Sequence, residues 1–224
     1  MKTAWLHKKG RQRLLLFCNG WGMDEKPFQL LGSRNYDVLM VYDYRDFYHS
    51  LDIETLFMEY EEVVLVGWSM GVWAGQQLFK MYGNCLAGAI AINGTLAPID
   101  DQLGIPRYFF TQTYTGFNEE TIQKFYKRMC REKTNLKRFL DNQPQRSLES
   151  RRLELGSLLK RAQNISVEQS IYTQVVVGNK DFIMPTRNQL HFWNKKNVHS
   201  LDGYHFLFYG WQSWDDLIDN PGQK

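Results

Sequence analysis

The chain has 224 residues, 43% of them hydrophobic and 15% aromatic, which is typical of one folded domain with a sizeable core. Its formal net charge is +3, and no window of the sequence approaches the ~18 apolar residues of a membrane span. This composition excludes a disordered or fibrous chain, and the N-terminus lacks the apolar core of a secretory signal peptide. Three widely spaced cysteines without a C-x-x-C pair are expected to be reduced, in a cytoplasmic protein without a zinc site.

Short apolar runs alternate with helix-like segments along the chain, a pattern that predicts a mostly parallel sheet covered by helices on both faces. We expect a weak strand near residue 5 and further strands at 14–18, 38–42, 63–66, 86–92, 171–177 and 197–201. Helices are expected near 28–31, 53–60, 72–82, 187–194 and 206–218.

The alternation stops after residue 92, and the sequence from 100 to about 167 contains no convincing strand. Apolar residues there recur at helical spacing, for example Ile122, Phe125, Tyr126 and Met129. We therefore predict a helical cap, residues 98–167, inserted into a core formed by 1–97 and 168–224.

The pentapeptide Gly-Trp-Ser-Met-Gly at 67–71 follows one of the apolar runs and precedes a helix-like run. A strand, a sharp turn carrying a serine and a helix make the nucleophile elbow of an α/β-hydrolase. The two glycines allow the tight turn that exposes the hydroxyl of Ser69 at the end of the sheet. The predicted fold is therefore an α/β-hydrolase with a mostly parallel central sheet and the cap inserted after its sixth-type strand.

A serine hydroxyl needs a base, and the base needs an acid that holds it in one tautomer. In this fold the acid and then the histidine follow the serine in the chain. His205 lies in a glycine-containing loop after the last predicted strand, and Asp181 lies in the turn after the strand before it. We predict Ser69 as nucleophile, His205 as base and Asp181 as acid; a satisfied core histidine and a turn-forming aspartate are the alternatives. The other histidines precede Ser69 or fall in predicted helices and strands: His7, His49, His191 and His199.

A tetrahedral oxyanion needs two N–H donors that are already in position. The residue after the nucleophile, Met70, supplies one backbone amide. The turn Asn-Gly-Trp-Gly at 19–22 follows an early strand, and Trp21 in it is expected to supply the other. A plain glycine-rich turn is the alternative.

The motifs at 19–22, 41–44, 67–73, 92–95, 104–106 and 203–206 together resemble the BioG type of pimeloyl-[acyl-carrier protein] methyl ester esterase. The resemblance runs over most of the chain and implies hydrolysis of the methyl ester of pimeloyl-[acyl-carrier protein] in biotin synthesis. It implies the same nucleophile, acid, base and oxyanion amides, with no cofactor and no metal. The turn reads Asn-Gly where His-Gly is common among hydrolases.

Residues 122–162 carry twelve Lys and Arg against four Asp and Glu, whereas the rest of the chain is mildly acidic. Acyl-carrier proteins are acidic, so a basic surface beside the pocket would speed and orient their encounter. The alternative is a solvated helical face. Nucleic acid is not an expected partner, because stacking aromatics and recognised modules are missing. The candidate docking residues are Arg128, Arg131, Lys137, Arg138, Arg151 and Arg152.

Aromatic residues near the cap entrance are candidates to line an acyl pocket, with packing between cap and core as the alternative. They are Trp68, Tyr108, Phe109, Phe110, Phe117 and Phe139. Two other activities fit the same motifs: an acyl thioesterase or broad short-chain esterase, and an inactive hydrolase homologue that only binds a carrier protein or a lipid.

Overall fold

The computed structural model describes residues 1–47, 52–162, 169–194 and 197–223. One seven-stranded sheet runs through it in the order β1-β3-β2-β4-β5-β6-β7. Its strands are β1 (Lys2–His7), β2 (Arg13–Cys18), β3 (Tyr36–Tyr42), β4 (Glu62–Trp68), β5 (Gly88–Ile92), β6 (Gln174–Gly178) and β7 (Val198–Leu201). The α-helices are α1 (Ile53–Glu59), α2 (Met70–Phe79), α3 (Arg107–Thr115), α4 (Glu119–Cys130), α5 (Lys133–Asp141), α6 (Leu148–Arg161), α7 (Thr186–Trp193) and α8 (Trp214–Asp219). No helix in these ranges is long and apolar enough to cross a membrane.

Strand β1 is antiparallel to β3, and the neighbouring strands from β3 to β7 are parallel. In this register Cys18 of β2 lies beside Gly67, and Trp68 lies beside Ile92 of β5. The carboxyl ends of the central strands therefore meet at one edge of the sheet. The turns that follow these strands emerge there, and they carry the candidate site.

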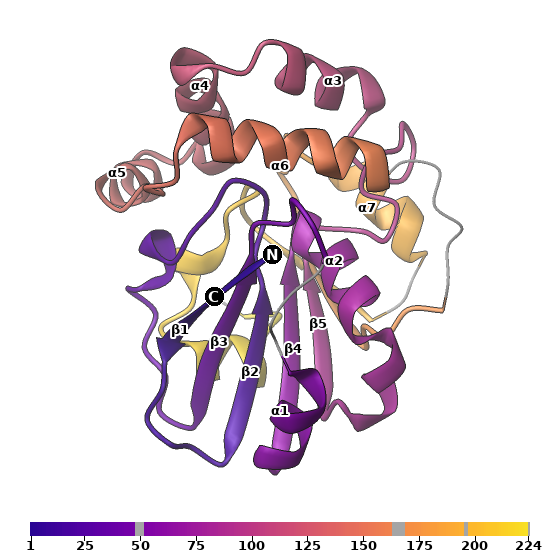
Figure 1. The fold of residues 1–224 in the computed structure, drawn as a ribbon. Coiled ribbons are helices and arrows are strands. Elements are labelled where there is room, and N and C mark those ends of the chain that lie inside the picture. The colour runs from indigo at the N-terminus through magenta and orange to yellow at the C-terminus, as the bar shows by residue number, and fades with distance from the viewer. Residues whose placement is uncertain (48–51, 163–168, 195–196, 224) are drawn as a thin grey trace.

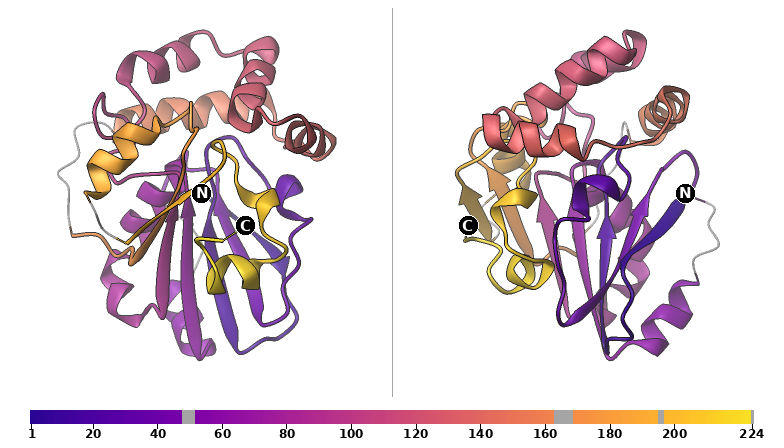
Figure 2. Two further views of the ribbon diagram at one scale, coloured as in Figure 1. Left: turned by 180° about the vertical axis from the view of Figure 1, so that it is seen from behind. Right: turned by 90° about the vertical axis from the view of Figure 1, so that its left-hand side faces the viewer.

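Helices cover both faces of the sheet, as Figures 1 and 2 show for α1 and α2 on one face and α8 on the other. Successive side chains of a strand point to opposite faces of the sheet, and adjacent residues of β2 pack against helices on each face. The ring of Phe17 packs against Trp214 of α8, with ring centroids 4.9 Å apart. Cys18 instead faces α2, where a Cβ on Gly75 would lie 3.4 Å from its Sγ. The central strand β2 is therefore covered by helices on both faces.

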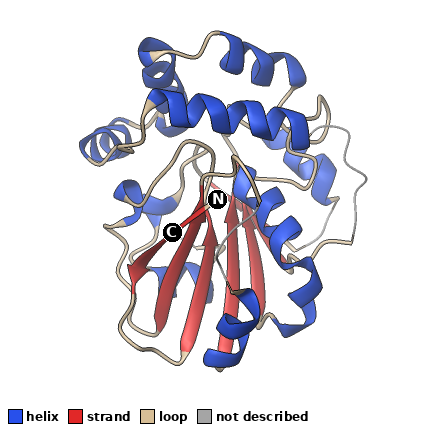
Figure 3. Ribbon diagram, in the orientation of Figure 1, coloured by secondary structure: helices blue, strands red, loops and turns tan. Residues whose placement is uncertain are grey.

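Helices α3 to α6 lie between β5 and β6 in the chain and cross above the carboxyl edge of the sheet (Figures 1 and 3). We call these four the cap helices. Side-chain caps begin three of them: Asn118 accepts a hydrogen bond from the Thr121 amide at α4, Glu132 caps α5, and Ser147 caps α6. The domain boundaries expected at 97/98 and 167/168 stay a prediction.

The predicted strands agree with the observed ones to within three residues, and the helices at 53–60 and 187–194 are also present. The helix predicted at 206–218 is wrong. Phe206 and Phe208 both pack against the ring of Trp68, at 5.5 Å between centroids. Residues two apart on a helix point to nearly opposite sides, so a helix would separate these rings. The chain forms a loop and a short 3-10 turn at Phe208–Gly210 instead, and α8 starts only after Ser213.

Two other predicted helices differ from the structure. The segment expected near 28–31 is a 3-10 turn at Lys26–Phe28, with Pro27 in its first turn. The helix expected at 72–82 ends at Phe79 and continues as a 3-10 segment, Lys80–Cys85.

Candidate active site

Ser69 occupies a strained backbone conformation between β4 and α2, with φ 55° and ψ −123°. A non-glycine residue at positive φ is uncommon and persists only where its surroundings hold it. The Ser69 amide donates to the carbonyl of Ile92 at 3.0 Å, and the elbow is packed so closely that a Cβ on Gly71 would come within 2.5 Å of the Asn19 carbonyl oxygen. The elbow predicted from the pentapeptide is therefore present, with Ser69 at the carboxyl edge.

His205 lies between the predicted nucleophile and the predicted acid. Its Nε2 is 2.9 Å from Ser69 Oγ, and its Nδ1 is 2.7 Å from Asp181 Oδ2. A carboxylate only accepts hydrogen bonds, so we assign the ring proton to Nδ1 and leave Nε2 free to accept from the serine hydroxyl. All three side chains are buried, with exposed fractions of 5% or less. The structure brings together the three residues that the chain order predicts.

The Asp181 carboxylate is held by four donors. Oδ1 accepts from the amides of Ile183 and Met184, at 2.8 and 3.1 Å, and Oδ2 accepts from Gln189 Nε2 at 2.9 Å as well as from His205. Asp181 is therefore also a turn residue, the alternative considered for it, and the turn hydrogen bonds hold its carboxylate toward His205. Gln189 was not predicted from the sequence. The only sequence feature that indicates its role is a polar residue in a helix that faces the sheet.

Asn93 fixes the loop that carries His205. Its Nδ2 donates to the carbonyls of Tyr204 and His205, at 3.0 and 2.9 Å, and its Oδ1 accepts from the Gly178 amide at 2.7 Å. Trp68 Nε1 donates to the same His205 carbonyl at 2.9 Å. Asn93 has φ 44°, a conformation that asparagine tolerates better than most residues. The Asn-Gly pair at 93–94 was the available signal, but it does not reveal the partners.

The two predicted oxyanion donors, Trp21 and Met70, line the same cavity as Ser69 and His205. Among the described residues, no protein acceptor pairs with the backbone N–H of either. The Gly20 amide is turned instead toward the side chain of Asn19, whose Oδ1 accepts from it at 2.7 Å. Two unpaired amides beside a buried hydroxyl can receive a developing negative charge.

The cavity above Ser69 has a volume of about 290 Å³ and mostly apolar walls. Three of the predicted pocket aromatics line it: Trp68, Phe109 and Phe110. Sequence reasoning missed other walls contributed by the cap and by the two sheet-edge loops: Met23, Ile105, Phe125, Leu155 and Ile183.

Three predicted pocket residues do not line this cavity. Phe139 is fully buried and packs against Tyr126 and Phe206. Tyr108 is 67% exposed, and Phe117 packs its ring against Trp21. Successive residues of a helix point about 100° apart, so Phe109 and Phe110 reach the cavity from one side of α3 while Tyr108 points away from it.

Cationic side chains surround the outer part of this cavity. Lys124 and Arg128 line it, and both also line an open hollow of about 420 Å³ beside it. Lys127, Arg131 and Phe182 complete that hollow, with the Arg131 guanidinium 4.6 Å from the centroid of the Phe182 ring. The two cavities therefore adjoin along the exposed face of α4. Lys124 and Lys127 were not among the predicted docking residues.

Of the other predicted docking residues, three are exposed and one is buried. Lys137, Arg138 and Arg152 are exposed. The prediction for Arg151 is wrong, since this side chain is only 8% exposed. Its guanidinium donates to the Tyr126 hydroxyl at 2.7 Å and to main-chain carbonyls of the cap, so it cannot reach a docked protein.

All three cysteines are free, and burial raises the pKa of the Cys18 and Cys130 thiols, which keeps them protonated. Within the ranges that the structure describes, no group of three or more His, Cys, Asp or Glu side chains could hold a metal ion.

The sheet order, the strained serine and the hydrogen-bonded Ser–His–Asp row define an α/β-hydrolase. At the level of fold alone, a lipase-esterase related protein from Clostridium acetobutylicum aligns with a TM-score of 0.56 and 12% identity, over 92% of this chain and 93% of that chain. The chain belongs to the BioG family: the family model described as "Pimeloyl-ACP methyl esterase BioG" matches residues 1–217.

Two further proteins have a higher sequence identity to this chain, and the first of them carries the name of the same family. The crystal structure of BioG from Haemophilus influenzae aligns with a TM-score of 0.86 and 30% identity, over 96% of this chain and 98% of that chain. A protein named malonyl-[acyl-carrier protein] O-methyltransferase, from Bacteroides fragilis (strain 638R), is 39% identical over 199 residues. That match takes in 88% of this chain but only 40% of the length of the Bacteroides protein.

Proposed function

We propose that this protein is a serine carboxylesterase that hydrolyses the methyl ester of pimeloyl-[acyl-carrier protein] to pimeloyl-[acyl-carrier protein] and methanol, in biotin biosynthesis in the cytoplasm. The observation that carries the proposal is the unbroken hydrogen-bonded row from Asp181 through His205 to Ser69 at the wall of an apolar cavity. Membership of the BioG family supports the choice of substrate.

In the first half of the reaction, Ser69 Oγ attacks the ester carbonyl carbon and His205 Nε2 takes the hydroxyl proton. Asp181 stabilises the imidazolium that forms, and it keeps the ring in the productive tautomer. The carbonyl oxygen becomes an oxyanion, and the amides of Trp21 and Met70 stabilise it. When the tetrahedral intermediate collapses, the C–O bond to the methoxy group breaks and His205 returns the proton, so that methanol leaves.

In the second half, water attacks the acyl-serine while His205 again takes a proton. A second tetrahedral intermediate forms on the same two amides, and its collapse gives the free carboxylic acid and restores the Ser69 hydroxyl. The reaction consumes one water and needs no redox step. The apolar cavity walls suit a methylene chain, and the buried site keeps other solvent away from the intermediates.

The cationic face of α4 supports an acidic carrier protein as the partner. Lys124 and Arg128 line both the cavity and the hollow outside it, and Lys127 and Arg131 extend the positive charge outward. Docking there would set the acyl arm at the cavity mouth. Lys137, Arg138 and Arg152 stay secondary candidates for the same docking surface.

Intact-mass spectrometry of methyl-pimeloyl carrier protein tests the reaction and separates it from thioester cleavage. We expect the carrier to lose the mass of one methylene group while it keeps its acyl arm, and Ser69→Ala to abolish this change. Loss of the whole acyl group, which leaves the free thiol arm, would instead establish a thioesterase. No change with the wild-type protein would leave only a binding role.

Charge reversal at Lys127 and Arg131 tests the docking surface. The double variant to Glu should raise the KM for the carrier-linked ester about 10-fold or more, since removing steering charges slows association. Hydrolysis of p-nitrophenyl butyrate should not change. Arg11→Glu is the matched control, because Arg11 is exposed in the loop that enters β2, at the opposite edge of the sheet. Equal effects on both substrates would contradict electrostatic docking.

A further inference from the structure

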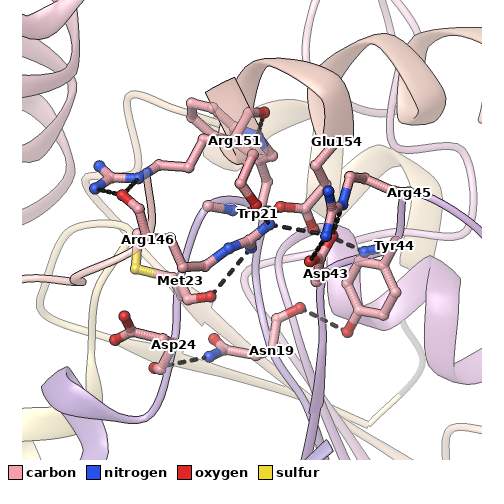
Figure 4. A network of polar contacts seen from close by, with 12 residues as sticks. Asn19, Trp21, Met23, Asp24, Asp43, Tyr44, Arg45, Arg146, Arg151 and Glu154 are labelled. Carbon is pink, nitrogen blue, oxygen red and sulfur yellow. Dashed lines mark hydrogen bonds and ion pairs between the residues drawn. The ribbon is translucent and has the colours of Figure 1, made fainter. Parts of the chain in front are cut away.

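A buried carboxylate on α6 contacts the loop that carries one of the proposed oxyanion donors. Glu154 is fully buried, and its Oε2 accepts from the Gly22 amide at 3.1 Å and from Arg146 Nη1 at 2.6 Å. Its Oε1 accepts from the Tyr44 amide at 3.0 Å, as Figure 4 shows. A carboxylate without water is costly unless donors surround it, and here both oxygens have donors. The buried Glu154 carboxylate therefore depends on these three donors, and it holds them in place in return.

Three consecutive residues of the 21–23 loop bind to this part of the cap. Besides the Gly22 amide, Trp21 Nε1 donates to the Arg151 carbonyl at 2.9 Å, and the Met23 carbonyl accepts from Arg146 Nη1 at 3.2 Å. The loop that presents the Trp21 backbone amide is thus fastened from the cap side. Since Gly22 has φ 75° and no side chain, contacts outside the loop must hold it in place.

Arg146 ties this arrangement to the sheet. Its Nη2 lies 3.1 Å from Asp43 Oδ1, and Asp43 also pairs with Arg45 at 2.7 Å (Figure 4). The side chains of Arg146, Glu154 and Asp43 are all less than 10% exposed. Lifting the start of α6 would leave these charges unpaired in a partly desolvated site, which is strongly unfavourable.

We propose that Glu154 is a positioning residue for the oxyanion hole: it holds the Gly22 amide and so limits the orientation of the neighbouring Trp21 amide. The inference rests on the proposed function, because the Trp21 amide matters only when Ser69 forms a tetrahedral intermediate. Glu154 does not line the cavity itself, so it acts on the reaction through the loop that it holds.

The test compares Glu154→Met and Glu154→Gln. Methionine removes both acceptors, whereas glutamine can keep one oxygen toward Gly22 and Arg146. With p-nitrophenyl butyrate we expect Glu154→Met to lower kcat about 10- to 100-fold, somewhat less than outright loss of an oxyanion donor. Glu154→Gln should recover most of that loss, and KM should stay within about threefold in both, because ground-state binding is retained.

The affinity for an alkyl trifluoromethyl ketone gives a readout that a merely structural role would not move. This inhibitor forms a tetrahedral adduct with serine, so its Ki should rise by the same factor as kcat/KM falls. Asp215→Asn is the matched control: Asp215 is buried and accepts from the amides of Arg34 and Asn35 at 2.9 Å, and none of these three residues lines the cavity. It should lower stability and leave kcat and Ki unchanged.

A folded Glu154→Met protein with wild-type kcat and Ki would overturn the inference. Should that variant fail to fold, Arg146→Lys takes its place, because lysine keeps the charge but cannot bridge Glu154, Asp43 and the Met23 carbonyl as the guanidinium does. Unchanged kcat and Ki in folded Arg146→Lys would then overturn it. A wild-type protein without esterase activity would contradict the proposed function instead, so the two failures are distinguishable.

Discussion

Asn93 joins three backbone segments at the carboxyl edge of the sheet, and we predict that Asn93→Gly lowers both stability and turnover. Glycine accepts the φ of 44° without strain, so the substitution removes the side-chain contacts without straining the backbone. The carbonyl of His205 keeps the hydrogen bond from Trp68, whereas the Gly178 amide and the Tyr204 carbonyl lose this partner.

The size of the effect follows from these contacts. At about 1–2 kcal/mol for each buried polar group left unpaired, the free energy of unfolding should fall by about 2–4 kcal/mol. The loop that carries His205 then loses the side-chain anchor that Asn93 provides, while Trp68 still holds the His205 carbonyl. A displacement on the order of 1 Å costs up to about 10²-fold in rate, so we expect kcat to fall about 10- to 100-fold.

Urea unfolding and p-nitrophenyl butyrate hydrolysis measure the two quantities. Asn188→Ala is the matched control, because Asn188 is also buried and donates to two main-chain carbonyls, those of Asp101 and Gly104, away from the three catalytic candidates. It should lose similar stability and keep its kcat. If Asn93→Gly lost the expected stability but kept kcat within about twofold, the loop-positioning argument would be refuted, since even small misplacement should be visible in the rate.

Two further predictions concern buried carboxylates. Asp181→Asn should lower kcat on the order of 10⁴-fold with little change in fold, because His205 would be held in the wrong tautomer; steady-state kinetics beside circular dichroism measure this. Burial alone would raise the pKa of Asp43, but the hydrogen bonds from Arg45 and the charge of Arg146 outweigh it, so the net pKa lies below its ordinary value. This contribution to stability is present above the unfolded pKa of about 3.9 and is lost as pH falls through the folded pKa. Asp43→Asn should therefore lower the free energy of unfolding by about 3 kcal/mol at neutral pH. In urea titrations below about pH 4, the difference in this free energy between wild type and variant should become smaller.

Each of these predictions has an outcome against it. Retention of more than about a tenth of wild-type kcat in Asp181→Asn would argue that Asp181 is a turn residue only. A stability gap for Asp43→Asn that stays constant, or grows, on acidification would mean that the ionised form of Asp43 is not what the folded state stabilises.

The chain order of the fold explains why the sequence identified Ser69, Asp181 and His205. Each follows a strand of the sheet, and parallel strands bring their carboxyl ends to one edge, so local patterns imply a shared position. The supporting contacts could not be predicted in this way. Asn93 acts through hydrogen bonds to residues 85 to 112 positions away. Gln189 binds Asp181 only eight positions earlier, but the folded turn decides that contact, and neither residue type announces its partner in the sequence.

The cap was harder to predict for a related physical reason. Helical periodicity identifies an apolar face but does not say whether that face meets the cavity or the core, so Phe139 was assigned to the wrong side. A charged residue is ordinarily exposed, which led to Arg151 as a docking residue. Its burial depends on acceptors such as the Tyr126 hydroxyl, and only the folded cap brings these together.

Labelling with an alkyl fluorophosphonate, followed by peptide mass mapping, tests the central claim most directly. We predict one label per chain, on the peptide that contains Ser69, with methyl-ester hydrolysis of the carrier-linked substrate lost in proportion to labelling and no label on His205→Gln. A label confined to another residue, or full hydrolysis by protein in which Ser69 is completely labelled, would contradict the account.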